Sequence, residues 1–401
     1  MASTNTTRLA VGDVLEVLIE KVAHGGHFIA RHGGAVIFVR HAIPGERARI
    51  TVTSTGASFN RGDVIEVLEP SPDRVIAPCT FAHRKGCGGC DFQHISVLRQ
   101  RQLKSEVITE QFSRIAKMEL HVEVEEVSGP LHWRTRSIAT TNNLGELGFY
   151  GARSHTVVPI SDCLIAADEM KMPELAARKW KSDVRIEIAT SKMKERNIAL
   201  APKRGEGKAR LTEGVSVLHE KVESKILEVS QDSFWQSHVK APEILTNFVL
   251  DFAQLQLDEH VLDLYGGVGL FTSAMADVVG SDGSIVLIEG SKSATGDAAR
   301  NFADKSQVKI LTGDVAKHLP HIDSAHVVVL DPPREGAGKV VLAQISRLTP
   351  RAVVYVACDP AALARDTGYF LELGYSLTKI KAFDLFPMTH HVECVALFNP
   401  A

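Results

Sequence analysis

The stretch VLDLYGGVGLFT, residues 261 to 272, decides the fold of the C-terminal part of the chain. Its apolar first half is typical of a buried strand, and the glycines that follow are typical of a tight turn into a helix. Around it, helical patterns alternate with short apolar runs, namely HVLDLYG, SIVLIEG, VKILTGD, HVVVLDPP and AVVYVACDP. This alternation predicts a doubly wound, mostly parallel α/β sheet from about residue 241 to the end of the chain.

Polar residues follow the predicted strands at the edge where sheets of this type bind ligands. Gly267 in the first turn would let a ligand approach the backbone closely. Glu289 ends the next strand, where a carboxylate can hold both hydroxyls of a ribose, and Asp314 ends the third. Position 272 is Thr, where a dinucleotide-binding turn needs glycine. The pattern predicts an adenosine-bearing ligand such as S-adenosylmethionine, although Glu289 and Asp314 could instead cap the helices that follow them.

A single thiol, Cys358, stands at the end of the fifth run, and Asp331 ends the fourth. An isolated cysteine is more often a structural residue, but the turn at Asp359 and Pro360 would leave this one at the ligand-binding edge. The last strand carries Glu393, whose pKa would be raised by burial toward the range that suits proton transfer. A thiol, a methyl donor and a base together fit methylation of a pyrimidine at carbon 5, because a thiolate added at carbon 6 activates that carbon.

Length, composition and charge limit the classes of protein to which the chain can belong. Its 401 residues, 44% of them hydrophobic, suit two or three globular domains. With 45 Lys+Arg and 48 Asp+Glu, the formal charge is −3, so any surface for nucleic acid must be local. The sequence shows neither a signal peptide nor an apolar run of about 18 residues, so we expect a cytoplasmic protein without a membrane partner.

The N-terminal half has two features of its own. Residues 8 to 68 alternate between apolar and polar positions with glycine-containing turns, which predicts a small β-barrel. Cys79, Cys87 and Cys90 follow a linker, and this spacing predicts a metal site, iron–sulfur or zinc, rather than free thiols. Residues 171 to 210 carry a local basic excess that fits either a solvated surface or an RNA-facing patch.

Three motifs together, DPPREGAG, YVACDPAALARD and FPMTHHVECVALF, resemble the S-adenosylmethionine-dependent RNA uracil-5-methyltransferase family. HGGHFIARHGGAVIFVRHAIPGE resembles its TRAM barrel, so the likeness spans nearly the whole chain. The resemblance implies a C-terminal α/β class I methyltransferase (Rossmann-like) domain, an N-terminal TRAM or OB-like β-barrel, and a central α+β domain carrying a metal cluster. We expect the barrel at residues 1–68, the central RNA-binding domain at 69–240 and the methyltransferase domain at 241–401.

The resemblance also implies roles for single residues. Cys358 would be the nucleophile, and Glu393 would be the base that removes the proton from carbon 5. Cys163 would complete the metal site, and the ribosomal-RNA-type branch of the family favours a [4Fe–4S] cluster there. The family usually has Asn-Pro after the nucleophile, where this chain has Asp359-Pro360. The expected cofactor-binding residues are Gln236, Tyr265, Gly267, Glu289, Asp314 and Asp331.

We therefore expect a monomeric enzyme that forms 5-methyluridine in ribosomal RNA or tRNA. Two alternatives stay open from the sequence. One is a cytosine-5 methyltransferase, although such enzymes acting on DNA place their cysteine after a proline. The other is a non-catalytic RNA-binding protein with a degenerate methyltransferase fold. The expected basic RNA contacts are Arg84, Lys85, Arg99, Arg101 and Lys104.

Overall fold

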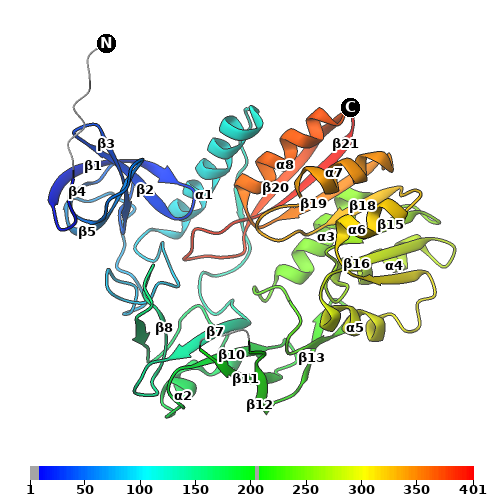
Figure 1. Ribbon diagram of the computed structural model, residues 1–401, viewed down its shortest axis with the longest axis horizontal. Helices are drawn as coiled ribbons and strands as arrows, with labels where there is room; N and C mark the ends of the chain where they lie inside the picture. Colours follow the sequence, from blue (N-terminus) through cyan, green and yellow to red (C-terminus); the bar gives the residue numbers. More distant parts are fainter. Residues whose placement is uncertain (1–8, 204–206) are drawn as a thin grey trace.

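The computed structural model, which describes residues 9–203 and 207–401, begins with a closed barrel, drawn in blue in Figure 1. Buried and partly buried side chains alternate along its strands, as in β3, so that one side chain in two fills the barrel. The barrel strands, neighbours in the order β1-β2-β3-β5-β4, are β1 (Val14–Ala23), β2 (His27–His32), β3 (Ala35–Arg40), β4 (Arg47–Ser54) and β5 (Asn60–Glu69). The predicted N-terminal barrel is confirmed.

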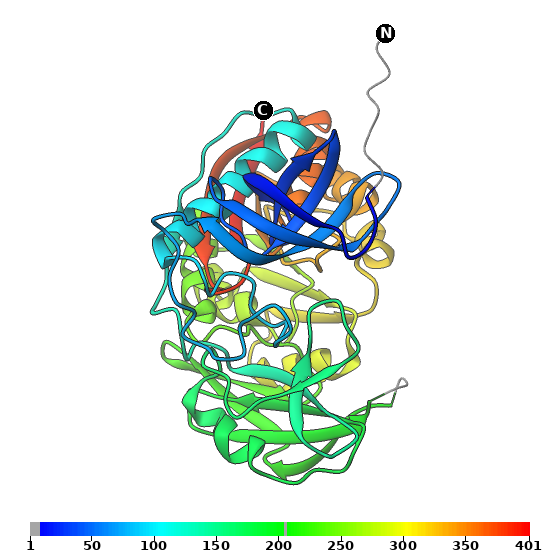
Figure 2. The ribbon, with the colours of Figure 1, turned by 90° about the vertical axis from the view of Figure 1, so that its left-hand side faces the viewer.

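A six-stranded antiparallel sheet, drawn in green at the bottom of Figure 2, carries much of the middle of the chain. Its strands, in the order β12-β11-β10-β7-β8-β9, are β7 (Arg136–Thr141), β8 (Leu147–Tyr150), β9 (Val157–Pro159), β10 (Val184–Thr190), β11 (Arg196–Pro202) and β12 (Arg210–Gly214). The short helix α2 (Met172–Ala176) precedes β10. A hairpin of β13 (Val217–Val222) and β14 (Lys225–Ser230) leads on to the C-terminal part.

The C-terminal part forms an eight-stranded sheet in the order β17-β16-β15-β18-β19-β21-β20-β6. The strands are β15 (His260–Leu264), β16 (Ser284–Glu289), β17 (Val308–Thr312), β18 (Val327–Leu330), β19 (Ala352–Ala357), β20 (Tyr375–Asp384), β21 (Glu393–Pro400) and β6 (Val124–Glu126). The helices between them are α3 (Ala241–Ala253), α4 (Leu270–Val279), α5 (Lys292–Asn301), α6 (Val315–His318), α7 (Gly338–Arg347) and α8 (Pro360–Glu372). Only β21 runs antiparallel to its neighbours, so the predicted doubly wound sheet is confirmed.

The sheet is covered on both faces, which explains the continuous apolar runs in the sequence. Every residue of β18 and β19 is buried. The strand order reverses between β15 and β18, and ligands of such folds bind in the crevice that this reversal opens at the carboxyl ends of the strands. In the described parts of the chain, no helix is long and apolar enough to cross a bilayer.

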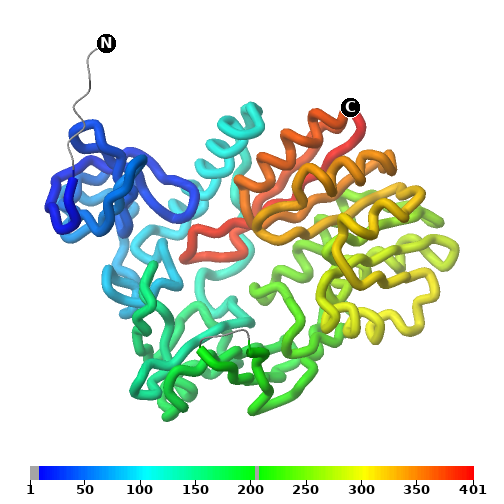
Figure 3. The backbone as a smooth tube through the Cα atoms, viewed as in Figure 1, coloured from blue at the N-terminus to red at the C-terminus, as the bar shows by residue number. Residues whose placement is uncertain are grey.

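Residues from the N-terminal half complete the C-terminal sheet. Helix α1 (Val97–Gln111) lies between the barrel and α8, as the tube in Figure 3 shows in cyan. The strand β6 then adds to the sheet edge, parallel to β20. Lys104 of α1 donates to Asp384 at the end of β20 over 2.6 Å, and both side chains are buried. The loop that follows Asp384 is therefore held by the N-terminal half of the chain.

Candidate active site

A cavity of about 910 Å³ opens where the parallel strands of the C-terminal sheet end. Its wall takes residues from the turns after β15, β16, β17, β18 and β19, as expected for a doubly wound sheet. The structure therefore brings together all eight residues that the sequence predicts for catalysis and cofactor binding. The eight are Gln236, Tyr265, Gly267, Glu289, Asp314, Asp331, Cys358 and Glu393.

The first turn of the domain leaves room beside its backbone. Gly267 has a positive φ of 56°, and nothing lies within 4 Å of the place where a Cβ would stand. Its amide donates to Glu289 Oε2 over 3.1 Å, and the amide of Ser291 donates to Glu289 Oε1 over 2.6 Å. Glu289 is thus held at the end of β16 with its carboxylate at the cavity wall, where a carboxylate can meet ribose hydroxyls.

Asp314 has two roles, since it lines the cavity and caps a helix. Its Oδ1 accepts from the amide of Ala316 over 2.8 Å, so Asp314 is the N-cap of α6. The capping role considered from the sequence is therefore present, and Asp314 lines the cavity as well. Glu289 does not cap the helix that follows it, because the side chain of Ser291 caps α5.

Two carboxylic acids, Asp331 and Glu393, line the cavity, and a third, Asp263, is fully buried. Burial and the charge of Asp263 raise the pKa of Asp331 to about 7, although Gln236 donates to its Oδ2 over 3.1 Å. Burial also raises the pKa of Asp263 to about 6, and Oδ1 of this residue is buried without a hydrogen-bond partner. Burial and Asp331 raise the pKa of Glu393 well above its ordinary value. Such a site favours a cation over an anion.

Cys358 directly follows β19, and Glu393 is the first residue of the neighbouring strand β21. Ala357 of β19 pairs with Cys394 of β21, so continuing this antiparallel register places Cys358 opposite Glu393. Residues opposite each other in such a pair have Cβ atoms about 5 Å apart. Burial, Glu393 and Asp331 raise the pKa of the Cys358 thiol to about 12, while Arg334 lowers it. Cys394 is fully buried, as expected for a core residue.

Among the other residues that border the cavity are Arg134, Phe234 and His391, which were not among the predicted site residues. Arg134 and Phe234 come from the central part of the chain, and His391 comes from the loop before β21. Phe234 is 67% exposed and precedes Gln236 by two residues, which places both on one side of an extended segment. The spacing of two residues from Gln236 was the sequence feature that could have predicted Phe234 at this cavity. Arg134 had no local signal, because only the fold brings it to the cavity.

The four cysteines predicted as metal ligands line a second, smaller cavity together with Arg134. Burial raises the pKa of Cys90 to about 12 and that of Cys163 to about 11. The Nε of Arg134 is buried without a hydrogen-bond partner. Within residues 9–203 and 207–401, no group of three or more His, Cys, Asp or Glu side chains is arranged to hold one metal ion.

The expected RNA contacts on α1 are engaged inside the protein. Arg99 pairs with Glu106, and Arg101 pairs with Glu126. Lys104 is 1% exposed, so the expectation that it meets RNA is wrong. In the basic stretch 171–210, seven of the twelve Lys and Arg residues form ion pairs, namely Lys171, Arg178, Arg185, Lys192, Arg196, Lys203 and Lys208. These pairs favour a solvated surface, while residues 204–206 lie outside the described part of the chain.

Fold and cavity together define a class I methyltransferase, and comparison with known proteins agrees. A TRAM domain profile matches residues 8–65, and a profile described as tRNA (Uracil-5-)-methyltransferase matches residues 317–400. A profile of protein-L-isoaspartate(D-aspartate) O-methyltransferase matches residues 217–323. The crystal structure of a Pyrococcus abyssi tRNA (uracil-54, C5)-methyltransferase with S-adenosyl-L-homocysteine has a similar fold, with a TM-score of 0.72 at 22% identity over 96% of this chain and 99% of that one.

Full-length relatives identify the family. An RNA methyltransferase of Streptomyces coelicolor is 40% identical over 98% of this chain and 94% of the relative. The 23S rRNA (uracil(1939)-C(5))-methyltransferase RlmD of Shewanella piezotolerans is 30% identical over 96% of this chain and 95% of the relative. The chain belongs to the S-adenosylmethionine-dependent RNA (uracil-5-)-methyltransferase family.

Proposed function

We propose that the protein forms 5-methyluridine in ribosomal RNA, with Cys358 as the nucleophile and Glu393 as the base. The observation that carries the proposal is that both residues line one cavity together with the predicted cofactor residues. Ribosomal RNA is preferred over tRNA because a relative aligned over nearly the full length is named for 23S rRNA.

Carbon 5 of uracil is a weak nucleophile, so the thiol must act first. The Cys358 thiol gives up its proton to solvent, its sulfur adds to carbon 6, and the electrons of the carbon 5–carbon 6 double bond move toward oxygen 4 as an enolate. S-adenosylmethionine would supply an electrophilic methyl group for the electron-rich carbon 5 and would leave as S-adenosylhomocysteine. Asp331, with its pKa raised to about 7, lines the same cavity as Cys358 and accepts from Gln236, which suits both residues to orienting the uracil ring.

Glu393 completes the reaction by removing a proton. After methyl transfer, carbon 5 bears both the methyl group and its original hydrogen. Glu393 accepts that proton, the double bond forms again, and the bond between carbon 6 and the sulfur breaks. The raised pKa of Glu393 makes it a stronger base than an exposed glutamate, which suits removal of a proton from carbon.

The described residues fit S-adenosylmethionine. Glu289 would hold the ribose hydroxyls, Asp314 would meet the adenine amine, and the open space beside Gly267 would take the ligand against the backbone. The acids Asp331 and Glu393 would stabilise the positive sulfonium near the thiol. This fit rests on the chemistry of the side chains at the cavity wall.

The proposal is tested by trapping the covalent intermediate. RNA containing 5-fluorouridine has no proton to lose at carbon 5, so wild-type protein with S-adenosylmethionine should form a denaturation-resistant adduct. Cys358→Ala should form none, and Glu393→Gln should accumulate methylated adduct on ordinary RNA. Cys394→Ala is the matched control, because this second thiol is fully buried, and its adduct should persist.

Two outcomes would contradict the assignment. An adduct that survives in Cys358→Ala removes that residue as the nucleophile, and normal turnover of Glu393→Gln removes Glu393 as the base. RNA with 5-fluorocytidine in place of 5-fluorouridine should give no adduct, which separates this activity from cytosine-5 methylation. Absence of any adduct from the wild type would support the alternative of a non-catalytic RNA-binding protein.

We also propose that Cys79, Cys87, Cys90 and Cys163 hold a [4Fe–4S] cluster. The four thiolates of such a cluster bind four different iron atoms, so they lie further apart than the ligands of one ion. This agrees with four cysteines that share a cavity without forming a single-ion site. The buried, unpartnered Nε of Arg134 supports the proposal, because a cation there would offset the negative charge of a thiolate-bound cluster.

The setting proposed for this activity is the cytoplasm, where S-adenosylmethionine and RNA are both present, with the protein acting as a monomer. The barrel and the central sheet would hold the RNA strand beside the flipped-out uridine, since small barrels of this kind bind oligonucleotides across one face.

A further inference from the structure

A turn of the N-terminal barrel contacts Asp359, the residue that follows the proposed nucleophile. His24, in the turn between β1 and β2, places its Nε2 3.0 Å from Oδ2 of Asp359, across 335 residues of sequence. A cavity of about 190 Å³ is walled by this turn on one side and by Cys358 on the other. Cys358 thus borders two cavities, the large one at the sheet edge and this smaller one beneath the barrel.

Asp359 uses both of its carboxylate oxygens. Oδ1 accepts from the amides of Ala361 and Ala362, over 3.0 and 2.9 Å, and so caps α8. Oδ2 faces His24. A carboxylate only accepts hydrogen bonds, so the imidazole must donate from Nε2. Because Asp359 directly follows Cys358, the two hydrogen-bonded oxygens fix the peptide that carries the thiol.

The same barrel turn also packs against the segment that leads to Glu393. Gly26 has a positive φ of 77°, and a Cβ at this position would lie 2.9 Å from the side chain of His390. His390 in turn contacts Asp91, with Nδ1 2.6 Å from Oδ2. One turn of the barrel therefore meets both segments that carry the proposed catalytic groups.

We propose that His24 is a positioning residue, which acts through Asp359 to hold the Cys358 sulfur at the distance from carbon 6 that addition needs. The inference rests on the proposed function and adds the barrel to the parts of the protein that serve the chemical step. Attack requires reacting atoms about 3 to 3.5 Å apart, and a shift of about 1 Å can slow a reaction by about a hundredfold. The family usually has an asparagine at the position of Asp359. In this chain the carboxylate of Asp359 accepts a hydrogen bond from His24 of the barrel.

The test separates the chemical step from RNA binding. With saturating 5-fluorouridine RNA and S-adenosylmethionine, His24→Ala should form the adduct about tenfold more slowly than the wild type. Its dissociation constant for the RNA should stay within about twofold, because the change lies behind the thiol. His24→Gln, whose amide still donates to the carboxylate, should recover most of the rate.

A double-mutant cycle shows whether His24 acts through Asp359. His24→Ala should lose little further rate in an Asp359→Ala background, because the partner is already absent. Additive losses would contradict a role through Asp359. Melting temperatures of all variants separate slow chemistry from poor folding.

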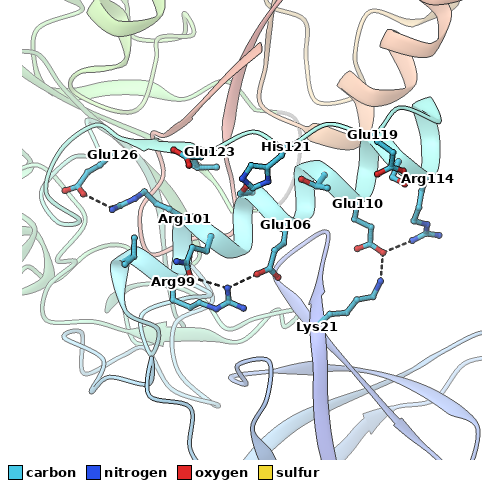
Figure 4. Close-up of a pocket in the computed structure, with 16 residues that line it drawn as sticks. Lys21, Arg99, Arg101, Glu106, Glu110, Arg114, Glu119, His121, Glu123 and Glu126 are labelled. Atoms are coloured by element: carbon cyan, nitrogen blue, oxygen red, sulfur yellow. Dashed lines mark hydrogen bonds and ion pairs between the residues drawn. The ribbon is translucent and has the colours of Figure 1, made fainter. Parts of the chain in front are cut away.

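Lys21→Ala is the matched control for docking of the barrel. Lys21, on β1 three residues before His24, pairs with Glu110 of α1 over 2.6 Å, and Figure 4 shows this pair. The adduct rate of Lys21→Ala should equal that of the wild type. An equal loss in both variants, a change in RNA affinity alone, or an unchanged rate in His24→Ala would each overturn the positioning role. A wild type that forms no adduct would instead overturn the proposed function.

Discussion

Cys358 is held as a neutral thiol by its surroundings, although a thiolate is the reactive form. Burial comes first among the causes that raise its pKa, followed by the charges of Glu393 and Asp331. Arg334 acts in the opposite direction. A bound sulfonium cation would lower the thiol pKa in the same way as Arg334, so cofactor binding and thiol activation are expected to be coupled.

Replacing Arg334 should therefore shift the pH dependence of thiol addition. Removing this cation raises the pKa of Cys358, so less thiolate is present at a given pH. The rate of adduct formation of Arg334→Ala should follow the wild-type pH profile displaced to higher pH by roughly half to one unit, since Arg334 is exposed to solvent. Arg334→Lys keeps the charge and should shift less. Equal displacement in both variants would contradict an effect of charge.

Single residues at the cavity were predictable where the fold class fixed their position. Asp331 and Cys358 each follow an apolar run, and parallel strands bring such ends to one edge. His24 was not predictable, because a histidine in a barrel turn carries no local sign of a partner 335 residues away. The one hint was Asp359, a carboxylate where the family usually has an amide.

At the scale of elements, α1 shows what periodicity can and cannot predict. The sequence of residues 97 to 116 has helical periodicity, and the structure forms α1 there over Val97–Gln111. Its charges were expected to face RNA, but a sequence pattern does not show which charge has an internal partner. Lys104 pairs with Asp384, 280 residues away, and also donates to the carbonyl of Phe386. The strand β6 was missed as well, because three residues are too few for a period to appear.

Breaking this buried pair should destabilise the protein strongly. Lys104→Ala leaves the carboxylate of Asp384 buried without its cation, which is expected to lower the free energy of unfolding by about 3 to 5 kcal/mol. Urea denaturation measures the loss. Lys381→Ala is the matched control, because its pair with Glu125 joins neighbouring β20 and β6 at an exposed site and should contribute less than about 1 kcal/mol. Similar losses in both variants would contradict the role of burial.

For the whole molecule, the sequence predicted the kinds of parts better than their assembly. The barrel and the C-terminal sheet each carry their own periodicity, whereas the central domain was expected from the resemblance. Contacts between them, such as α1 against both the barrel and α8, depend on residues that are distant in sequence. The cysteine cavity belongs to this scale, since Cys163 joins the other three only through folding of the central part.

A cluster at that cavity should be visible in the purified protein. Protein prepared without oxygen should contain about four iron atoms per chain and absorb visible light. Cys90→Ser should lose the iron and melt at a lower temperature, because the cluster would join segments of the central part. Cys394→Ala should keep its iron, since that thiol lies in the core of the C-terminal sheet. Zinc in place of iron, or no metal at all, would contradict the proposed cluster.

During synthesis, β6 leaves the ribosome long before the strand with which it pairs. Glu125 is separated from its partner Lys381 by 256 residues, and β20 must emerge before the edge of the sheet can close. The nascent N-terminal half therefore carries an unmatched strand and helix face through most of translation. A fragment that begins at residue 241 would lack both and would expose the backbone of β20, which favours aggregation of such a truncated chain.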